Sequence, residues 1–74
     1  MREAQIKQQP IELYKILKLE ALVGSGGEAK MVIADGRVTV NGKVELQKRK
    51  KIVAGDEISF NQESIRVVVK NAWI

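Results

Sequence analysis

The chain has no cysteine and no histidine among its 74 residues. Without cysteine, neither a disulfide bond nor a thiolate metal site can stabilise the fold. Without histidine, it lacks the side chain most often used as a general base near neutral pH and most often bound to metals. A domain of this size also has little room for a deep substrate pocket. We therefore expect a non-catalytic protein with no metal site and no cofactor.

Long apolar runs are missing as well. No segment approaches the roughly 18 apolar residues that a membrane span requires. Residues 1–10 are polar and do not have the pattern of a signal peptide. These features predict one soluble domain, residues 1–74, located in the cytoplasm and monomeric by default.

Aromatic residues are scarce, with one each of tyrosine, phenylalanine and tryptophan. Tyr14 and Phe60 fall on the apolar faces of predicted elements, so we expect both in the core. Trp73 is the only candidate for stacking on a nucleic-acid base, although packing against the body of the protein is the favoured interpretation. An aromatic platform for single strands is therefore not expected.

Positive charge is concentrated in the second half of the chain. The net charge is +4, with 13 Lys and Arg against nine Asp and Glu. Residues 1–36 are neutral overall, so the whole surplus lies in residues 37–74. The basic residues of the densest segment are Arg37, Lys43, Lys48, Arg49, Lys50 and Lys51. Such a concentration is typical of a surface that meets a polyanion, although a solvated loop would look the same.

Two short helices are predicted in the first half. Apolar residues recur every three or four positions over residues 11–19, after Pro10, which suits the first position of a helix. The predicted buried face extends to the leucine at position 19. Ser25 followed three residues later by Glu28 forms a capping box, which predicts the start of a second helix. Gly36 stands where a residue with positive φ would end that helix.

Two glycines follow the serine of the capping box. Gly26 and Gly27 each weaken a helix by about 1 kcal/mol relative to alanine. Two explanations remain open from the sequence. The backbone at this turn either approaches a neighbouring helix closely or approaches a phosphate group.

Beyond residue 36 the apolar pattern has a period of two, which indicates strands. Asn41–Gly42 supplies the two positive-φ residues of a tight hairpin turn. The predicted strands are residues 38–40, 44–46, 57–60 and 65–69. The element order predicts an α+β fold in which two N-terminal helices pack on a small, mostly antiparallel sheet. Residues 1–9 are predicted to be a frayed N-terminal segment.

Residues 13–58 resemble the RNA-binding domain first described in the small-subunit ribosomal protein S-four, also called the alpha-L motif. The similarity lies in the segment LYKILKLEALVGSGGEAKMVIADGRVTVNG, followed by the element KIVAGDEI. The SGGEAK segment and the short length are similar to the free-standing bacterial members of that family. The resemblance implies two helices on a small sheet and a basic surface that binds structured RNA, such as ribosomal or transfer RNA.

The resemblance also implies which residues contact RNA. The residues that it carries over, together with the basic residue of the hairpin, are Ser25, Gly26, Gly27, Lys30, Arg37, Asn41, Lys43, Lys48, Arg49, Lys50 and Lys51. Many relatives that act on ribosomal RNA have two basic residues where this chain has Gly26 and Gly27. This departure lowers the expected charge at that turn and gives more weight to the lysine-rich loop, which the sequence predicts to be flexible.

Two other functions were weighed against RNA binding. A protein-interaction adaptor could use the same basic loop to bind an acidic partner. A sulfur-carrier or ubiquitin-like domain is disfavoured, because such carriers end in Gly-Gly whereas this chain ends in Asn71-Ala72-Trp73-Ile74.

Overall fold

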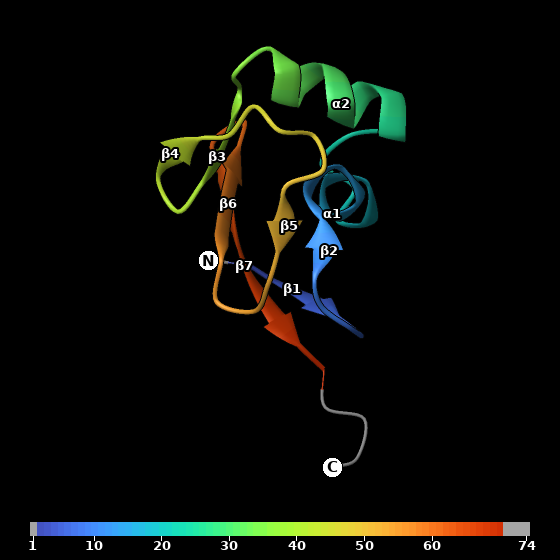
Figure 1. Ribbon diagram of the computed structural model, residues 1–74, viewed down its shortest axis with the longest axis vertical. Coiled ribbons are helices and arrows are strands. Elements are labelled where there is room, and N and C mark those ends of the chain that lie inside the picture. Colours follow the sequence, from blue (N-terminus) through green and yellow to red (C-terminus); the bar gives the residue numbers. More distant parts are fainter. Residues whose placement is uncertain (1, 71–74) are drawn as a thin grey trace.

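A five-stranded mixed sheet forms the body of the protein (Figure 1). The computed structural model describes residues 2–70. In order across the sheet, the strands are β1 (Arg2–Ile6), β7 (Glu63–Val69), β6 (Glu57–Phe60), β3 (Val38–Val40) and β4 (Lys43–Val44). β1 runs parallel to β7, and the pairings β7–β6, β6–β3 and β3–β4 are antiparallel.

A small second sheet and two helices complete the fold. β2 (Ile11–Glu12) pairs antiparallel with β5 (Lys51–Ile52). α1 (Leu13–Leu19) begins directly after β2, and α2 (Gly26–Ala34) precedes β3. Within residues 2–70, no helix has the length and apolar character needed to cross a membrane.

One hydrophobic core joins both helices to both sheets. Its fully buried members include Leu13 and Leu17 of α1, Ile33 of α2 and Ile52 of β5. Phe60 is also buried in this core, as the sequence predicts, and Tyr14 packs against it half-buried. Burying a large aliphatic side chain of this kind contributes about 1.5–3 kcal/mol. Trp73 lies outside the residues that the structure describes.

The prediction of a frayed N-terminal segment is wrong. Residues 2–6 form β1, which pairs with β7 over its whole length, from Arg2 opposite Ile65 to Ile6 opposite Val69. Ala4 and Ile6 are buried. This period-two pattern is too short to stand out in the sequence, and its hydrogen-bonding partner is about sixty residues away along the chain. The helices are therefore not N-terminal elements, because strands precede them.

The first helix is shorter than predicted. It spans Leu13–Leu19, seven residues. Ile11 and Glu12 form β2 opposite Ile52 and Lys51, so Pro10 precedes a strand and not a helix. Long-range pairing outweighs the helical pattern at these two positions.

The predicted start of the second helix and the predicted hairpin turn are confirmed. Ser25 is the N-cap of α2, and its Oγ accepts a hydrogen bond of 3.1 Å from the Glu28 amide. The Glu28 carboxylate accepts from the amide of Gly24, one residue before the cap, at 2.8 Å. Asn41 and Gly42 both have positive φ, 53° and 83°, as a tight hairpin turn requires.

Candidate nucleic-acid interface

The lysine-rich segment is held against the start of α1. The amide of Leu13 donates to the carbonyl of Lys50 at 2.9 Å, and the amide of Tyr14 donates to the carbonyl of Lys48 at 3.2 Å. These amides belong to the first turn of a helix and have no acceptor within it. The four residues Lys48–Lys51, hereafter the basic loop, therefore cap α1 through the carbonyls of Lys48 and Lys50. The flexible loop predicted from the sequence is instead anchored at three places, since Lys51 also pairs with Glu12 in the small sheet.

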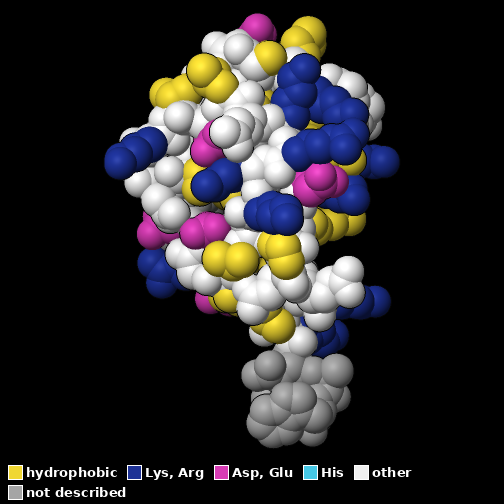
Figure 2. Space-filling view, viewed as in Figure 1, with side chains coloured by type: hydrophobic (Ala, Val, Ile, Leu, Met, Phe, Trp, Pro, Cys, Tyr) yellow, Lys and Arg dark blue, Asp and Glu magenta, His cyan; other side chains and the backbone are white. Residues whose placement is uncertain are grey.

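The side chains of the basic loop remain free to meet solvent. All four residues of this loop are exposed. Because the carbonyls of Lys48 and Lys50 bond to α1, the backbone serves the fold while the cationic side chains stay at the surface. Lys and Arg side chains gather on the upper right of the face drawn in Figure 2.

Tyr14 connects the basic loop to the start of α2. Its backbone amide bonds to Lys48, and its ring lies beneath the ammonium group of Lys30, whose Nζ is 4.8 Å from the ring centroid. The Nζ of Lys15 is 5.9 Å from the same centroid. A Cβ added at Gly26 would lie 3.9 Å from the ring. The tyrosine therefore positions two cations by cation–π contact and fixes α2 beside the loop.

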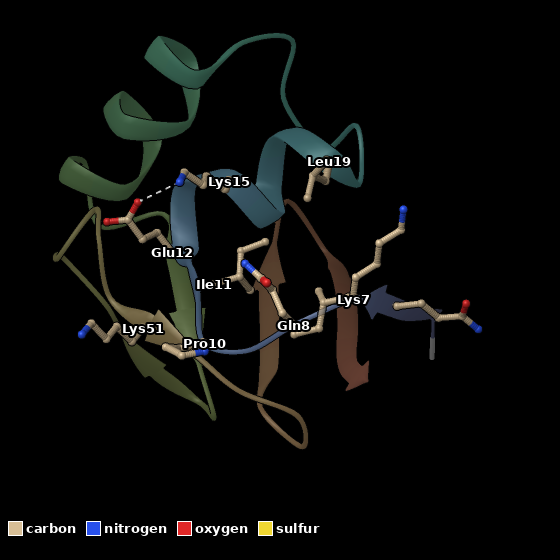
Figure 3. A pocket seen from close by; sticks show the side chains of 10 residues that line it. Lys7, Gln8, Pro10, Ile11, Glu12, Lys15, Leu19 and Lys51 are labelled. Atoms are coloured by element: carbon tan, nitrogen blue, oxygen red, sulfur yellow. Dashed lines mark ion pairs between the residues drawn. The ribbon is translucent and has the colours of Figure 1, made fainter. Parts of the chain in front are cut away.

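One carboxylate lies among these cations. Glu12 is about a quarter exposed and pairs with the Nζ of Lys15 at 3.3 Å, the contact drawn in Figure 3, and with the Nε of Arg49 at 3.9 Å. Partly exposed pairs of this kind contribute at most about 1 kcal/mol. Their effect here is to orient two long side chains and to offset part of the repulsion within the cluster.

We call this cluster the basic surface. It consists of Lys15, Lys30, Lys48, Arg49, Lys50 and Lys51. Five of its members are predicted from the sequence. The sequence analysis does not predict Lys15 as a member. Its position indicates the role, because it lies three residues after Glu12 and next to Tyr14 on the exposed side of the first helix.

Three other predicted site residues lie elsewhere. Arg37 packs its guanidinium over the ring of Phe60, 5.4 Å from the centroid. Lys43 is in the edge strand β4, which Figure 1 shows on the side of the molecule away from α1. Arg37 is linked to α2 through its backbone amide, which donates to the carbonyl of Val32 at 3.1 Å.

Asn41 has a structural role. Its Nδ2 donates to Asp56 at 3.0 Å, and its Oδ1 accepts from the Glu57 amide at 2.9 Å. The other carboxylate oxygen of Asp56 accepts from the Val53 amide at 3.0 Å. Asn41 and Asp56 together join the hairpin turn to the turn before β6, and these bonds use one of the two N–H donors of the Asn41 side chain.

The first turn of α2 contains the remaining predicted residues. A Cβ added at Gly27 would meet only the Oγ of Ser25, at the ordinary contact distance of 3.9 Å. The contact of Gly26 with Tyr14 is equally relaxed. Close packing against another helix therefore does not explain either glycine, which leaves the approach of a phosphate as the explanation still open.

The sequence is similar to one protein family and to two bacterial proteins. A family model described as the S4 domain matches residues 4–68. The chain is 50% identical over 62 residues to the Escherichia coli protein named "Putative RNA-binding protein YbcJ", which covers 84% of this chain and 89% of that protein. A Shigella flexneri protein named "Uncharacterized protein YbcJ" matches with the same figures.

Two solved structures share the fold. The solution structure of YbcJ from Escherichia coli, described as containing an alpha-L motif involved in RNA binding, superposes with a TM-score of 0.71 at 46% identity and covers 92% of this chain and 87% of that one. The 30S ribosomal protein S4e from Thermoplasma acidophilum gives a TM-score of 0.68 at 31% identity, covering 81% of this chain and 32% of that one. The α+β fold described above is thus an alpha-L fold.

Proposed function

The chain belongs to the S4 domain family, and we propose on this basis that it is a non-catalytic module that binds structured RNA, of the ribosomal or transfer type, through phosphate contacts. The relative named as an RNA-binding protein, and its structure with a motif described as involved in RNA binding, support an RNA partner. The basic surface is the part of this chain whose chemistry fits such a partner.

The observation that carries the proposal is the anchoring of the basic loop. Backbone hydrogen bonds hold the main chain of four consecutive cationic residues at a fixed place beside α1. Little conformational entropy of the backbone would therefore be lost when the loop binds, in contrast to a flexible loop, which must be ordered first. The side chains on this anchored backbone stay exposed and can adjust to the phosphates of a folded RNA.

The first turn of α2 extends this surface. A helix N-terminus presents amides that lack intrahelical acceptors and the positive end of a dipole. The glycines at positions 26 and 27 leave the backbone there uncovered, so a phosphate could reach it. The Glu28 carboxylate near this turn accepts a hydrogen bond from the Gly24 amide.

Recognition by this surface would depend on RNA shape. Lysine contacts to phosphates position a nucleic acid without reading its bases. Double-stranded RNA is recognised largely by its shape and backbone, because side chains cannot read its narrow major groove. We therefore expect a preference for folded RNA over a flexible single strand.

The test is a salt titration of binding to ribosomal RNA, duplex DNA and a flexible single strand. Wild type is compared with a Lys48→Gln/Lys50→Gln variant, which keeps the carbonyls that cap α1. For about four phosphate contacts, the log–log salt slope should be roughly −3 for wild type, and the variant should lose about 1 from its magnitude for each contact removed.

An Arg66→Gln/Lys70→Gln variant is the matched control, because it removes the same charge from β7 and the residue after it. It should keep the wild-type slope. Equal slopes for the two variants would assign binding to net charge alone. Failure of wild type to bind any nucleic acid at low salt would reject RNA binding and favour an acidic protein partner.

A further inference from the structure

An open groove of about 730 Å³ lies next to the basic surface. It runs between α1 and the segment that connects β1 to β2, and Figure 3 shows its lining. Its volume is within the roughly 300–1,000 Å³ typical of small-ligand sites. Lys15 and Lys51 line the groove and also belong to the basic surface, so the two features are continuous.

The groove has an aliphatic lining. Ile6, Pro10, Ile11 and Leu19 contribute to it. Leu19 is 66% exposed although the helical pattern predicts it on the buried face of the first helix. Leu19 thus continues the aliphatic lining out to the solvent, and a ligand in the groove would remove its apolar surface from water.

Polar groups in the groove are of two kinds. Three lysines line it from three separate elements: Lys7 after β1, Lys15 in α1 and Lys51 in β5. The carboxylate of Glu12 is the one acidic group among its lining residues, and it is already paired with Lys15 and Arg49. The amides of Gln5 and Gln8 offer both donors and acceptors. Figure 3 shows Gln8 beside Ile11, with Lys7 and Lys51 on opposite sides.

We propose that this groove takes up one unstacked base of the RNA that the basic surface binds, a step that rests on the function proposed above. The flat apolar faces of a base fit between aliphatic walls, and its edge carries the donors and acceptors that a glutamine amide can match. The lysines around the groove meet the two flanking phosphates. The contact adds a preference for a bulged or flanking nucleotide that phosphate contacts alone cannot provide.

Affinity measurements compare two probes, a blunt RNA hairpin and the same hairpin with one unpaired uridine in its stem. Wild type should bind the bulged hairpin about fivefold more tightly, at the low end of what base contacts provide because the walls are aliphatic and not aromatic. Leu19→Ser should remove this preference and leave binding to the blunt hairpin unchanged. Val44→Ser, at a valine of similar exposure (58%) in β4, is the matched control and should keep the preference.

A second measurement separates this proposal from the proposed function. In a ¹⁵N-labelled sample, the side-chain amides of Gln5 and Gln8 should shift with the bulged hairpin only. The side-chain amide of Gln47, which adjoins the basic loop, should shift with both hairpins. Silent Gln5 and Gln8 signals together with a shifting Gln47, or equal affinity for the two hairpins, would overturn the base-binding groove alone. No measurable affinity for either hairpin, together with an unmoved Gln47 signal, would overturn both proposals.

Discussion

A single methyl group tests whether RNA approaches the first turn of α2. Gly27 is the second residue of this helix, and a Cβ there would have the Ser25 Oγ as its nearest neighbour at 3.9 Å. Replacing Gly27 by Ala thus creates no clash. It does place a methyl group beside the backbone amides that the proposed function assigns to a phosphate.

Two effects of opposite sign are expected from Gly27→Ala. Alanine is favoured over glycine in a helix by about 0.5–1 kcal/mol. In a domain of this size 1 kcal/mol moves the midpoint of thermal unfolding by roughly 4–8 °C, so the variant should gain about 2–8 °C. RNA affinity should fall about tenfold, because a hydrogen bond to a charged group contributes about 1.5–3 kcal/mol and about 1.4 kcal/mol corresponds to a factor of ten.

Thermal unfolding followed by circular dichroism measures the first effect, and titration of a labelled RNA hairpin measures the second. Gly36→Ala is the control, because the φ of Gly36 is +75° and a side chain there is strained by about 1–2 kcal/mol. That variant should lose stability and keep its RNA affinity below its unfolding temperature. If Gly27→Ala is stabilised and still binds RNA as wild type does, no phosphate approaches this turn.

Two further substitutions test the roles assigned to Asn41 and to β1. Asn41→Ala removes both side-chain hydrogen bonds to Asp56 and Glu57 and leaves alanine at a positive φ, so urea unfolding should show a loss of about 1–2 kcal/mol while the salt slope of RNA binding stays unchanged. A slope reduced by about 1 would instead make Asn41 a phosphate contact. Ile6→Ala truncates a side chain that is 5% exposed and should cost about 2–4 kcal/mol in the same assay, whereas a frayed segment would show no loss.

Elements with local signals are the ones that sequence reasoning predicts well. The capping serine of α2 and the positive-φ pair Asn41–Gly42 each act within four residues of chain. Their chemistry is therefore visible in a short window of sequence. β6 and β7 are predicted for a similar reason, since both alternate apolar and polar residues and they pair across a short turn. The strand predicted over residues 44–46 is shorter, Lys43–Val44, with Val44 and Leu46 exposed, and β5 is a strand that the sequence reasoning did not predict.

Features that depend on distant pairing could not be predicted in this way. The parallel partner of β1 is β7, the last strand along the chain. No local turn joins the two strands, so a short window of sequence does not show that they pair. The capping of α1 is equally hidden, because the acceptors are backbone carbonyls of Lys48 and Lys50. A backbone carbonyl can accept a hydrogen bond whatever its side chain. The sequence therefore shows the positive charge of the basic loop but does not show that the loop is anchored to α1.

The basic loop caps α1 through backbone carbonyls and carries its positive charge on side chains, so capping and charge affect stability separately. Holding the cations of this loop near Lys15 and Lys30 raises their mutual repulsion, which the single carboxylate of Glu12 offsets only in part. The carbonyl bonds to α1 hold the loop in place in spite of that repulsion. A bound polyanion would remove the repulsion without disturbing those bonds. Relief of this repulsion should therefore contribute to the affinity for RNA, and through that affinity to the stabilisation of the fold by bound RNA. Added salt should screen the same repulsion and stabilise the fold when RNA is absent.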